Sequence, residues 1–354
     1  MKDATRKTRT RRMSGNACAQ ASVLGLALTM AGWGPAIAAP TAQVPTVTIG
    51  KAVDTIPFTV VDVAIAKGFF KKNGVNVKED LVQGSSAANA AMVGGSLQFS
   101  CEAADPLMLA RSHGVPVIAV DALDDGVTLQ LIVSKQWLAK HPVGAKATFK
   151  KKMADLNGSI FAEVGTTDQA FYRLLRGWAG LPKKHGYRVE QVGSLAAVAI
   201  SIQRGVVDVS IQSPPHSVQL AQQGAAVEFV DRKDVKQFNN VAYDILTTTT
   251  AYAKAHPQTT RKVATAIAQA LNFMRSHPNQ TLALEQKHFK TLDKAVLQHS
   301  LKLIPFAKDG MQSQKGWDQA VVLAQQTGFI KGVKSAPEGV YWTNKYIDRS
   351  KLGK

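Results

Sequence analysis

Cysteine is almost absent from this sequence. Among 354 residues there are two, Cys18 and Cys101. Cys18 falls in an N-terminal stretch typical of an export signal, so the processed protein would keep Cys101 alone and form no internal disulfide. Such a protein relies on its hydrophobic core, which a chain of this length with 45% hydrophobic residues can supply. We expect Cys101 to pack as a small buried hydrophobic residue.

Motifs that carry catalytic chemistry are missing as well. The sequence has no GxSxG elbow, P-loop, GxGxxG fingerprint, HExxH or CxxC motif. Its eight histidines are dispersed, and no pair stands at helical spacing with a third metal ligand nearby. We therefore expect no catalytic residues, no metal site and no cofactor.

The basic charge does not indicate a nucleic-acid partner. The formal net charge is +18, of which residues 1–38 contribute +5 and the remainder +13. The Lys and Arg residues are scattered, and no recognised nucleic-acid motif or aromatic–basic interleaving accompanies them. We expect a solvated basic surface and no nucleic acid.

Residues 1–38 have the layout of a signal peptide. A basic stretch ends at Arg12, a weakly apolar segment runs from Ala17 to Ala31, and Ala36-Ile37-Ala38 offers a cleavage site. We expect cleavage after Ala38 or Ala39 and a periplasmic protein. The pair Arg11-Arg12 leaves twin-arginine export open beside the general route. No later stretch is long and apolar enough to span a membrane.

From Val47 onward, strands and helices alternate. A helix is predicted over Phe58–Lys72, another from Ser85 or Ser86 to Gly94, and a third from Pro106. The expected strands cover residues 47–50, 75–82, 97–101 and 115–122. This alternation predicts a parallel sheet with helices on both faces.

An internal near-repeat suggests two lobes of one design. A shift of 110 residues places Gly95 on Gly205, Gly114 on Gly224, and Asp121 on Asp231. The period has the size of a domain rather than of a solenoid repeat. We therefore expect α/β lobes at residues 45–128 and 129–234, followed by a return to lobe 1 and C-terminal helices over 235–354.

Two segments are expected to cross between the lobes, at residues 129–133 and 241–248. Helices predicted after the second crossing, over residues 257–277, 278–289, 294–303 and 314–327, should pack back on the first lobe. Two crossing segments make a hinge, and hinged lobes that close on a ligand are a recurrent binding architecture.

Polar turns open the helices at the carboxyl ends of the predicted strands, where α/β sheets bind ligands. Each turn alone is more often an ordinary helix cap, but together they outline one cleft between the lobes. The candidate ligand-binding residues are Thr55, Ile56, Pro57 and Phe58; Gly84, Ser85 and Ser86; Glu102, Ala103, Ala104 and Asp105; Gly165, Thr166, Thr167 and Asp168; and Gln212, Ser213, Pro214 and Pro215.

These turns have carboxylates but little Lys or Arg. Glu102, Asp105 and Asp168 could pair with an ammonium group of a ligand, although Asp105 and Asp168 could instead simply cap helices. Phe58 and Tyr243 are aromatic residues that could pack against an organic portion of the ligand.

A family resemblance joins these features. Residues Ala64 to Val77 resemble the A-x-x-x-G-[FY]-[FY]-x-x-x-G-[LV]-x-V signature of nitrate, sulfonate and taurine periplasmic binding proteins, which include pyrimidine-precursor binders. Asp155 to Gly158 and Gly205 to Asp208 continue the pattern. Gln98 replaces an Asp of the family pattern, and Ser159 replaces a Lys. The resemblance implies a type II periplasmic-binding-protein fold with the ligand between its lobes.

The resemblance also implies a function. We expect an extracytoplasmic protein that captures a small organic anion or zwitterion, such as a sulfonate or taurine, and delivers it to the permease of an ABC importer. A pyrimidine-precursor or nitrate binder of the same fold is the alternative. A pyrimidine-synthase-like enzyme is less compatible, because those enzymes are cytosolic and carry a Cys and His cluster. Binding proteins of this kind are usually monomers.

Overall fold

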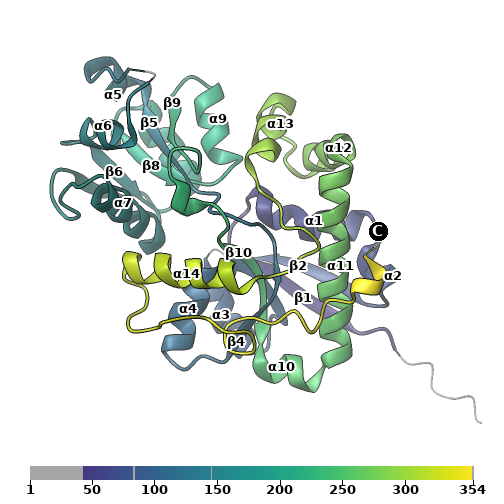
Figure 1. Ribbon diagram of the computed structural model, residues 1–354. Helices are drawn as coiled ribbons and strands as arrows, with labels where there is room; N and C mark the ends of the chain where they lie inside the picture. The colour runs from purple at the N-terminus through teal and green to yellow at the C-terminus, as the bar shows by residue number, and fades with distance from the viewer. Residues whose placement is uncertain (1–42, 83, 145, 353–354) are drawn as a thin grey trace, which may run out of the picture. The chain divides into compact units, whose positions relative to one another are not determined.

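The computed structural model describes residues 43–82, 84–144 and 146–352, and the chain from Val44 onward forms one compact unit. The predicted signal peptide, residues 1–38, lies outside the described residues. The unit contains two five-stranded sheets, each with helices packed around it (Figure 1). We call the first sheet and its helices lobe 1, and the second sheet and its helices lobe 2.

The two sheets have the same strand order. Lobe 1 has the order β2-β1-β3-β10-β4, and lobe 2 has the order β7-β6-β8-β5-β9. The lobe 1 strands are β1 (Thr46–Lys51), β2 (Asn76–Leu81), β3 (Phe99–Ala103), β4 (Val117–Ala122) and β10 (Asp244–Thr249). The lobe 2 strands are β5 (Gln130–Ser134), β6 (Ile160–Glu163), β7 (Arg188–Gln191), β8 (Val209–Gln212) and β9 (Ala226–Val230).

The prediction of a parallel sheet is correct for only part of each sheet. β10 pairs antiparallel with β3 and β4, and β5 pairs antiparallel with β8 and β9. Both antiparallel strands come directly after the chain has changed lobes: β5 is the first strand of lobe 2, and β10 is the strand with which the chain returns to lobe 1. The remaining pairs, β1 with β2 and β3, and β6 with β7 and β8, are parallel as expected.

The internal repeat is confirmed as structural. Gly95 and Gly205 follow equivalent helices, and both have positive φ, +82° and +70°. Gly114 and Gly224 precede the equivalent strands β4 and β9 with φ of +80° and +75°. Glycine adopts this left-handed conformation without steric cost, so these repeated glycines end the helices of both lobes at matching points.

The helices of lobe 1 differ in detail from the prediction. The expected helix over 58–72 is divided into η1 (Ile56–Thr59), α1 (Val60–Ala66) and α2 (Phe69–Lys72), because Gly68 with φ of +71° ends α1. Neither Ser85 nor Ser86 is the N-cap of α3 (Ser85–Val93), since Gly84 takes that position. α4 (Ala104–Ser112) begins two residues before Pro106, which its first turn accommodates.

Lobe 2 and the C-terminal region supply the remaining helices. Lobe 2 has α5 (Lys135–Lys140), α6 (Phe149–Ala154), α7 (Thr166–Trp178), α8 (Leu195–Gln203) and α9 (His216–Gln222), with η2 (Lys236–Phe238) after it. The C-terminal region has α10 (Thr250–Ala255), α11 (Pro257–Ser276), α12 (Pro278–His288), α13 (Lys294–Leu303), α14 (Gln314–Thr327) and η3 (Arg349–Lys351).

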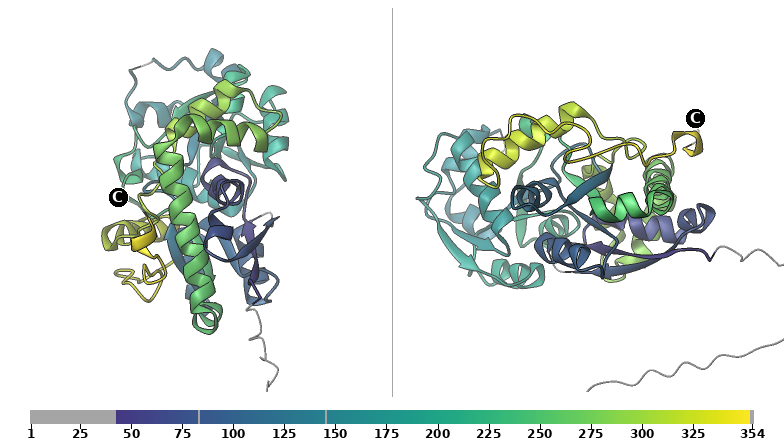
Figure 2. Two further views of the ribbon diagram at one scale, coloured as in Figure 1. Left: turned by 90° about the vertical axis from the view of Figure 1, so that its right-hand side faces the viewer. Right: turned by 90° about the horizontal axis from the view of Figure 1, so that it is seen from below.

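The expectation that every C-terminal helix packs on lobe 1 is wrong. α11 does pack against α1 and α2, but α13 contacts α9 of lobe 2, and α14 contacts both α4 and α7 (Figures 1 and 2). The buried face of α14, with Trp317 and Val321, belongs to one hydrophobic cluster that also contains Met108 of lobe 1 and Phe171 of lobe 2. These two helices therefore connect the lobes in addition to the crossing strands.

Cys101 is fully buried on β3, which confirms its expected role as a core residue. None of the helices in the described ranges has the length and apolar character that a membrane span needs.

The loop around Arg176 gives a stability prediction. Gly186 has φ of +85°, and an added Cβ would collide with Asn157 Oδ1 and lie 2.7 Å from Arg176 Nη2. Gly180 has a similar φ of +74° but open space around it. Gly180→Ala should cost about 1–2 kcal/mol for the left-handed backbone, and Gly186→Ala about 1–3 kcal/mol more for overpacking. Urea unfolding of both variants tests this, and equal losses would contradict it.

Candidate functional site

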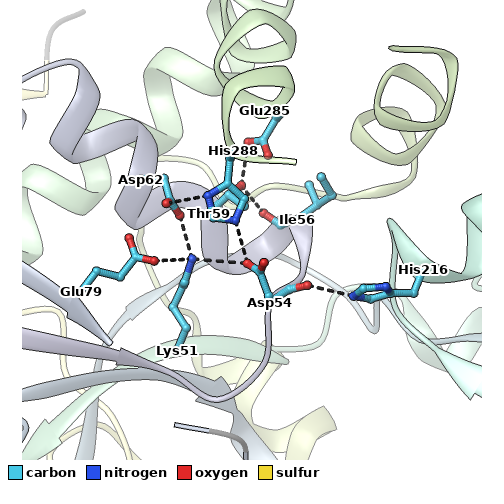
Figure 3. Close-up of polar contacts among 9 residues, drawn as sticks. All are labelled: Lys51, Asp54, Ile56, Thr59, Asp62, Glu79, His216, Glu285 and His288. Carbon is cyan, nitrogen blue, oxygen red and sulfur yellow. Dashed lines mark hydrogen bonds and ion pairs between the residues drawn. The ribbon is translucent and has the colours of Figure 1, made fainter. Parts of the chain in front are cut away.

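Two of the predicted turns meet across the lobes. The Ile56 N–H, at the start of η1 in lobe 1, donates a hydrogen bond of 3.1 Å to the Pro214 carbonyl in lobe 2. His216 Nε2, at the start of α9, lies 3.1 Å from the Asp54 carbonyl oxygen (Figure 3). Burial lowers the pKa of His216, so its neutral ring can donate this bond. The structure thus joins the turn at 54–58 to the turn at 212–216.

A buried lysine anchors the first of these turns. Lys51 is 2% exposed, and its Nζ lies 2.6 Å from Glu79, 3.0 Å from Asp62 and 3.4 Å from Asp54 (Figure 3). His288 of α12 completes the group, with Nε2 2.8 Å from Asp54 Oδ1 and Nδ1 2.9 Å from Asp62 Oδ1. We call these five residues the Lys51 cluster.

Opposite charges in the Lys51 cluster favour the ionised forms of Lys51, His288 and two of the carboxylates, whereas burial and the charge of Asp62 raise the pKa of Glu79. Burial lowers the pKa of Lys51, but the three carboxylates outweigh burial and raise it above its ordinary value. Hydrogen bonds to Asp54 and Asp62 raise the pKa of His288 to about 10. Burial raises the pKa of Asp54 and Asp62, yet the bond from His288 and the charge of Lys51 bring both below their usual range.

A second contact to α12 fixes the same turn. The Thr59 hydroxyl lies 2.8 Å from the Ile56 carbonyl and 2.6 Å from Glu285 Oε1. Burial raises the pKa of Glu285 to about 8, so this carboxyl is protonated at neutral pH. A protonated Glu285 can donate to Thr59 while Thr59 donates to the Ile56 carbonyl, so the one hydroxyl proton of Thr59 suffices for both contacts.

The turn at 212–215 also reaches the crossing segments. Ser213 Oγ lies 3.2 Å from Thr128 Oγ1, and the Thr128 hydroxyl donates 3.0 Å to Asp244 Oδ2. Asp124 Oδ1 accepts a 3.0 Å bond from the Asp244 N–H. Burial raises the pKa of Asp124 well above its usual range, and Asp244 increases it further. Movement of the lobes would therefore act directly on these polar contacts.

Two predicted carboxylates stand at the first turns of α4 and α7. Asp168 Oδ2 accepts hydrogen bonds from the Val164 and Gly165 N–H groups at 3.3 and 3.2 Å, so it caps its own helix. Neither oxygen of Asp105 accepts a bond from another described residue, although its side chain is buried. Burial raises the pKa of Asp105 to about 7 and that of Asp168 to about 6.

Asp105 lines a small cavity between the lobes. Phe171 from α7 and Tyr243 before β10 share its wall, with α14 closing one side. Lobe 2 offers a comparable buried polar group, because Gln212 is 2% exposed and neither atom of its amide has a partner among the described residues.

Other predicted residues have different surroundings. Glu102 is fully buried inside lobe 1, where it accepts bonds from Asn89 at 2.9 Å and Thr247 at 2.8 Å. Phe58 is a core residue of lobe 1. The Gly84 N–H bonds the Ala52 carbonyl at 2.6 Å. The remaining predicted residues stand at the starts of their helices: Thr55 and Pro57 at η1; Ser85 and Ser86 in α3; Ala103 and Ala104 at α4; Gly165, Thr166 and Thr167 at α7; and Pro215 before α9.

Sequence reasoning missed the Lys51 cluster. Lys51 is the last residue of β1 and is itself buried, and a buried lysine needs anionic partners. The three carboxylates come from the loop after β1, from α1 and from β2, and His288, which binds two of them, lies on α12, more than 200 residues further along the chain. Only the folded arrangement could identify them.

Comparison with models of protein families identifies the family of this chain. A family model described as NMT1/THI5 like matches residues 56–281. The chain belongs to the NMT1/THI5-like family. This confirms the resemblance noted in the sequence. No curated protein sequence matches this family member.

Solved structures show the same fold for this NMT1/THI5-like protein. A protein from Bordetella bronchiseptica RB50 has a TM-score of 0.70 and 22% identity, over 85% of this chain and 95% of its own. The alkanesulfonate-binding protein SsuA from Xanthomonas axonopodis pv. citri has a TM-score of 0.63 and 17% identity, over 84% and 98%. The nitrate-binding protein NrtA from Synechocystis PCC 6803 has 0.64 and 13%, over 81% and 82%. The chain therefore has the periplasmic-binding-protein fold with two α/β lobes.

Breaking the Lys51 cluster is predicted to destabilise the protein strongly. Lys51→Met would leave three close carboxylates with His288 as their only described cation, and should cost about 3–5 kcal/mol of unfolding free energy. The control is Lys151→Met, since Lys151 pairs with Asp155 but is 61% exposed; it should cost less than about 1 kcal/mol. Chemical denaturation gives both values, and similar losses would contradict a structural role for the cluster.

The contribution of His288 to stability is predicted to depend on pH. Its pKa is raised from 6.5 to about 10 on folding, so its stabilisation is fully present below pH 6.5 and is lost as pH rises through about 10. Asp54 and Asp62 remain ionised over this range. Urea midpoints of the protein and of His288→Gln should differ most near pH 6 and converge above pH 10. A difference that stays constant across that range would refute the assignment.

Proposed function

We propose that this protein is an exported solute-binding protein that captures a small organic molecule between its lobes and delivers it to an ABC importer. The observation that carries this proposal is the direct hydrogen bond from Ile56 to Pro214. It brings together the turn after β1 of lobe 1 and the turn after β8 of lobe 2. A ligand that binds both turns would favour the closed arrangement of the lobes over the open one.

The ligand that fits best is a zwitterion such as taurine, or a similar small organic sulfonate. The N-termini of α3 and α7, at Ser85 and Thr167, offer backbone N–H groups for an anionic end. The buried carboxyl of Asp105 suits a cationic end. Nitrate has no such group, so the acidic side of the site favours an organic ligand over the ligand of NrtA.

A pyrimidine precursor is the second candidate. Phe171 and Tyr243 lie beside Asp105, so aromatic side chains stand next to a carboxyl that could bind an amino substituent of such a ligand. An enzymatic role has less support, because none of the described residues around Asp105 forms a nucleophile and base pair.

Export and partners follow from the same proposal. The signal-like residues 1–38 would direct the chain to the periplasm, where a monomer would meet the permease of its importer. The closed lobes, with α13 and α14 spanning them, would form the surface that the permease recognises.

A thermal-shift screen tests the proposal. The refolded protein would be scanned with taurine, alkane sulfonates, nitrate, aminopyrimidines and aromatic acids. A ligand at 100 times its Kd should stabilise the protein by about 2.7 kcal/mol. Gln212→Leu should reduce the ligand-induced shift without lowering the stability of the free protein, because it removes only an unpartnered buried amide. Failure of every class to stabilise the protein would count against a solute-binding function.

A further inference from the structure

The carboxyl of Asp105 is buried without a counter-ion. The residue is 6% exposed, and neither carboxylate oxygen has a hydrogen-bond partner on another described residue. Burying a carboxylate in this way is costly, and folded proteins usually pair such a group. A partner supplied from outside the chain would remove that cost.

The space beside Asp105 has the size of one small polar group. Its volume is about 10 Å³, which is room for a single water-sized group. An ammonium head is of that size. Phe171 and Tyr243 form part of the wall, and aromatic faces attract cations electrostatically. The cavity therefore combines a carboxyl with two aromatic rings, which is the chemistry that recognises a protonated amine.

The surroundings of Asp105 are acidic on more than one element. Asp168 on α7 and Asp244 on β10 both act on it electrostatically, and Tyr243 lies beside it. No ion pair found among the described residues involves Asp105, Asp168 or Asp244, whereas the three carboxylates of the Lys51 cluster surround a buried lysine. The carboxylates of the Lys51 cluster thus have a cation supplied by the protein, whereas the carboxyls around Asp105 have none among the described residues.

We propose that Asp105 binds a positively charged nitrogen of the solute, so that the molecule captured is a primary amine or a similarly protonated base. The assignment rests on the proposed function and narrows it to one class of ligand. Phe171 and Tyr243 enclose the charged nitrogen, and Asp168 and Asp244 increase the negative potential that attracts it. Simple sulfonates and nitrate lack the group that this part of the site binds.

The assignment implies a pH dependence with a definite sign. Burial raises the pKa of Asp105 to about 7, so at lower pH the carboxyl must lose a proton before it can pair with an ammonium group. Affinity for an amine should therefore rise about tenfold per pH unit from pH 5 to pH 7 and then level off. Asp168, Asp244 and Tyr243 are the titratable groups that face Asp105 from α7, from β10 and from the loop before β10.

Matched ligand pairs test the assignment without any variant. Calorimetric titrations would compare taurine with isethionate, and an aminomethylpyrimidine with its hydroxymethyl analogue. Each pair differs only in an amine against a hydroxyl. The amine of at least one pair should bind about 30-fold more tightly or better. Equal or tighter binding of the hydroxyl members, or no binding of any amine, would overturn the assignment.

A pair of variants adds a second readout. Asp105→Asn should abolish both the preference for the amine and the pH dependence. Asp121→Asn is the matched control, because Asp121 is also fully buried without a partner but lies on β4 beneath Gly310; it should change neither. A preference for amines that survives in Asp105→Asn would refute the role of Asp105. Binding of the anion-only members alone would refute the amine assignment and leave solute binding intact, whereas no binding in either arm would contradict the proposed function as well.

Discussion

The buried ammonium of Lys51 is the constraint on which the rest of the site depends. Its three carboxylate partners come from the loop after β1, from α1 and from β2, and His288 ties two of them to α12. These ion pairs fix the turn at Asp54 to Ile56, and this turn is hydrogen-bonded to the turn at Pro214 to His216 of lobe 2. This turn is therefore held by contacts within the protein and needs no ligand to form them.

The carboxylates of the Lys51 cluster and the carboxyls around Asp105 differ in whether the protein supplies a cation for them. In the Lys51 cluster the carboxylates are satisfied by protein cations, and their electrostatic energy contributes to the fold. Around Asp105 the carboxyls have no described cation, and burial keeps part of them protonated. The first arrangement is complete without a ligand, while we propose that a ligand completes the second. This contrast gives a physical reason to place recognition at Asp105 rather than at the larger charged group.

Much of the fold could be predicted from the sequence because its signals are local. The glycines at 95, 114, 205 and 224 mark equivalent helix ends, and the alternation of strands and helices gave both lobes. The antiparallel direction of β5 and β10 could not be predicted. It depends on the side from which the chain enters each sheet after leaving the other lobe, and no local sequence signal reports this. The turns at 55–58 and 212–215 were identified by their composition, but the inward position of Glu102 and the partners of Lys51 arise from contacts between distant segments.

The most direct test of closure on a ligand is an interlobe distance measured by electron paramagnetic resonance. Val93 at the end of α3 and Ile200 on α8 are exposed on different lobes, and Cys101 is fully buried, so Val93→Cys and Ile200→Cys can carry the two spin labels. With a saturating amine ligand, identified by its thermal stabilisation of the same protein, the distance distribution should become narrower and its mean should change. An unchanged distribution under those conditions would contradict the account of two lobes that close on their solute.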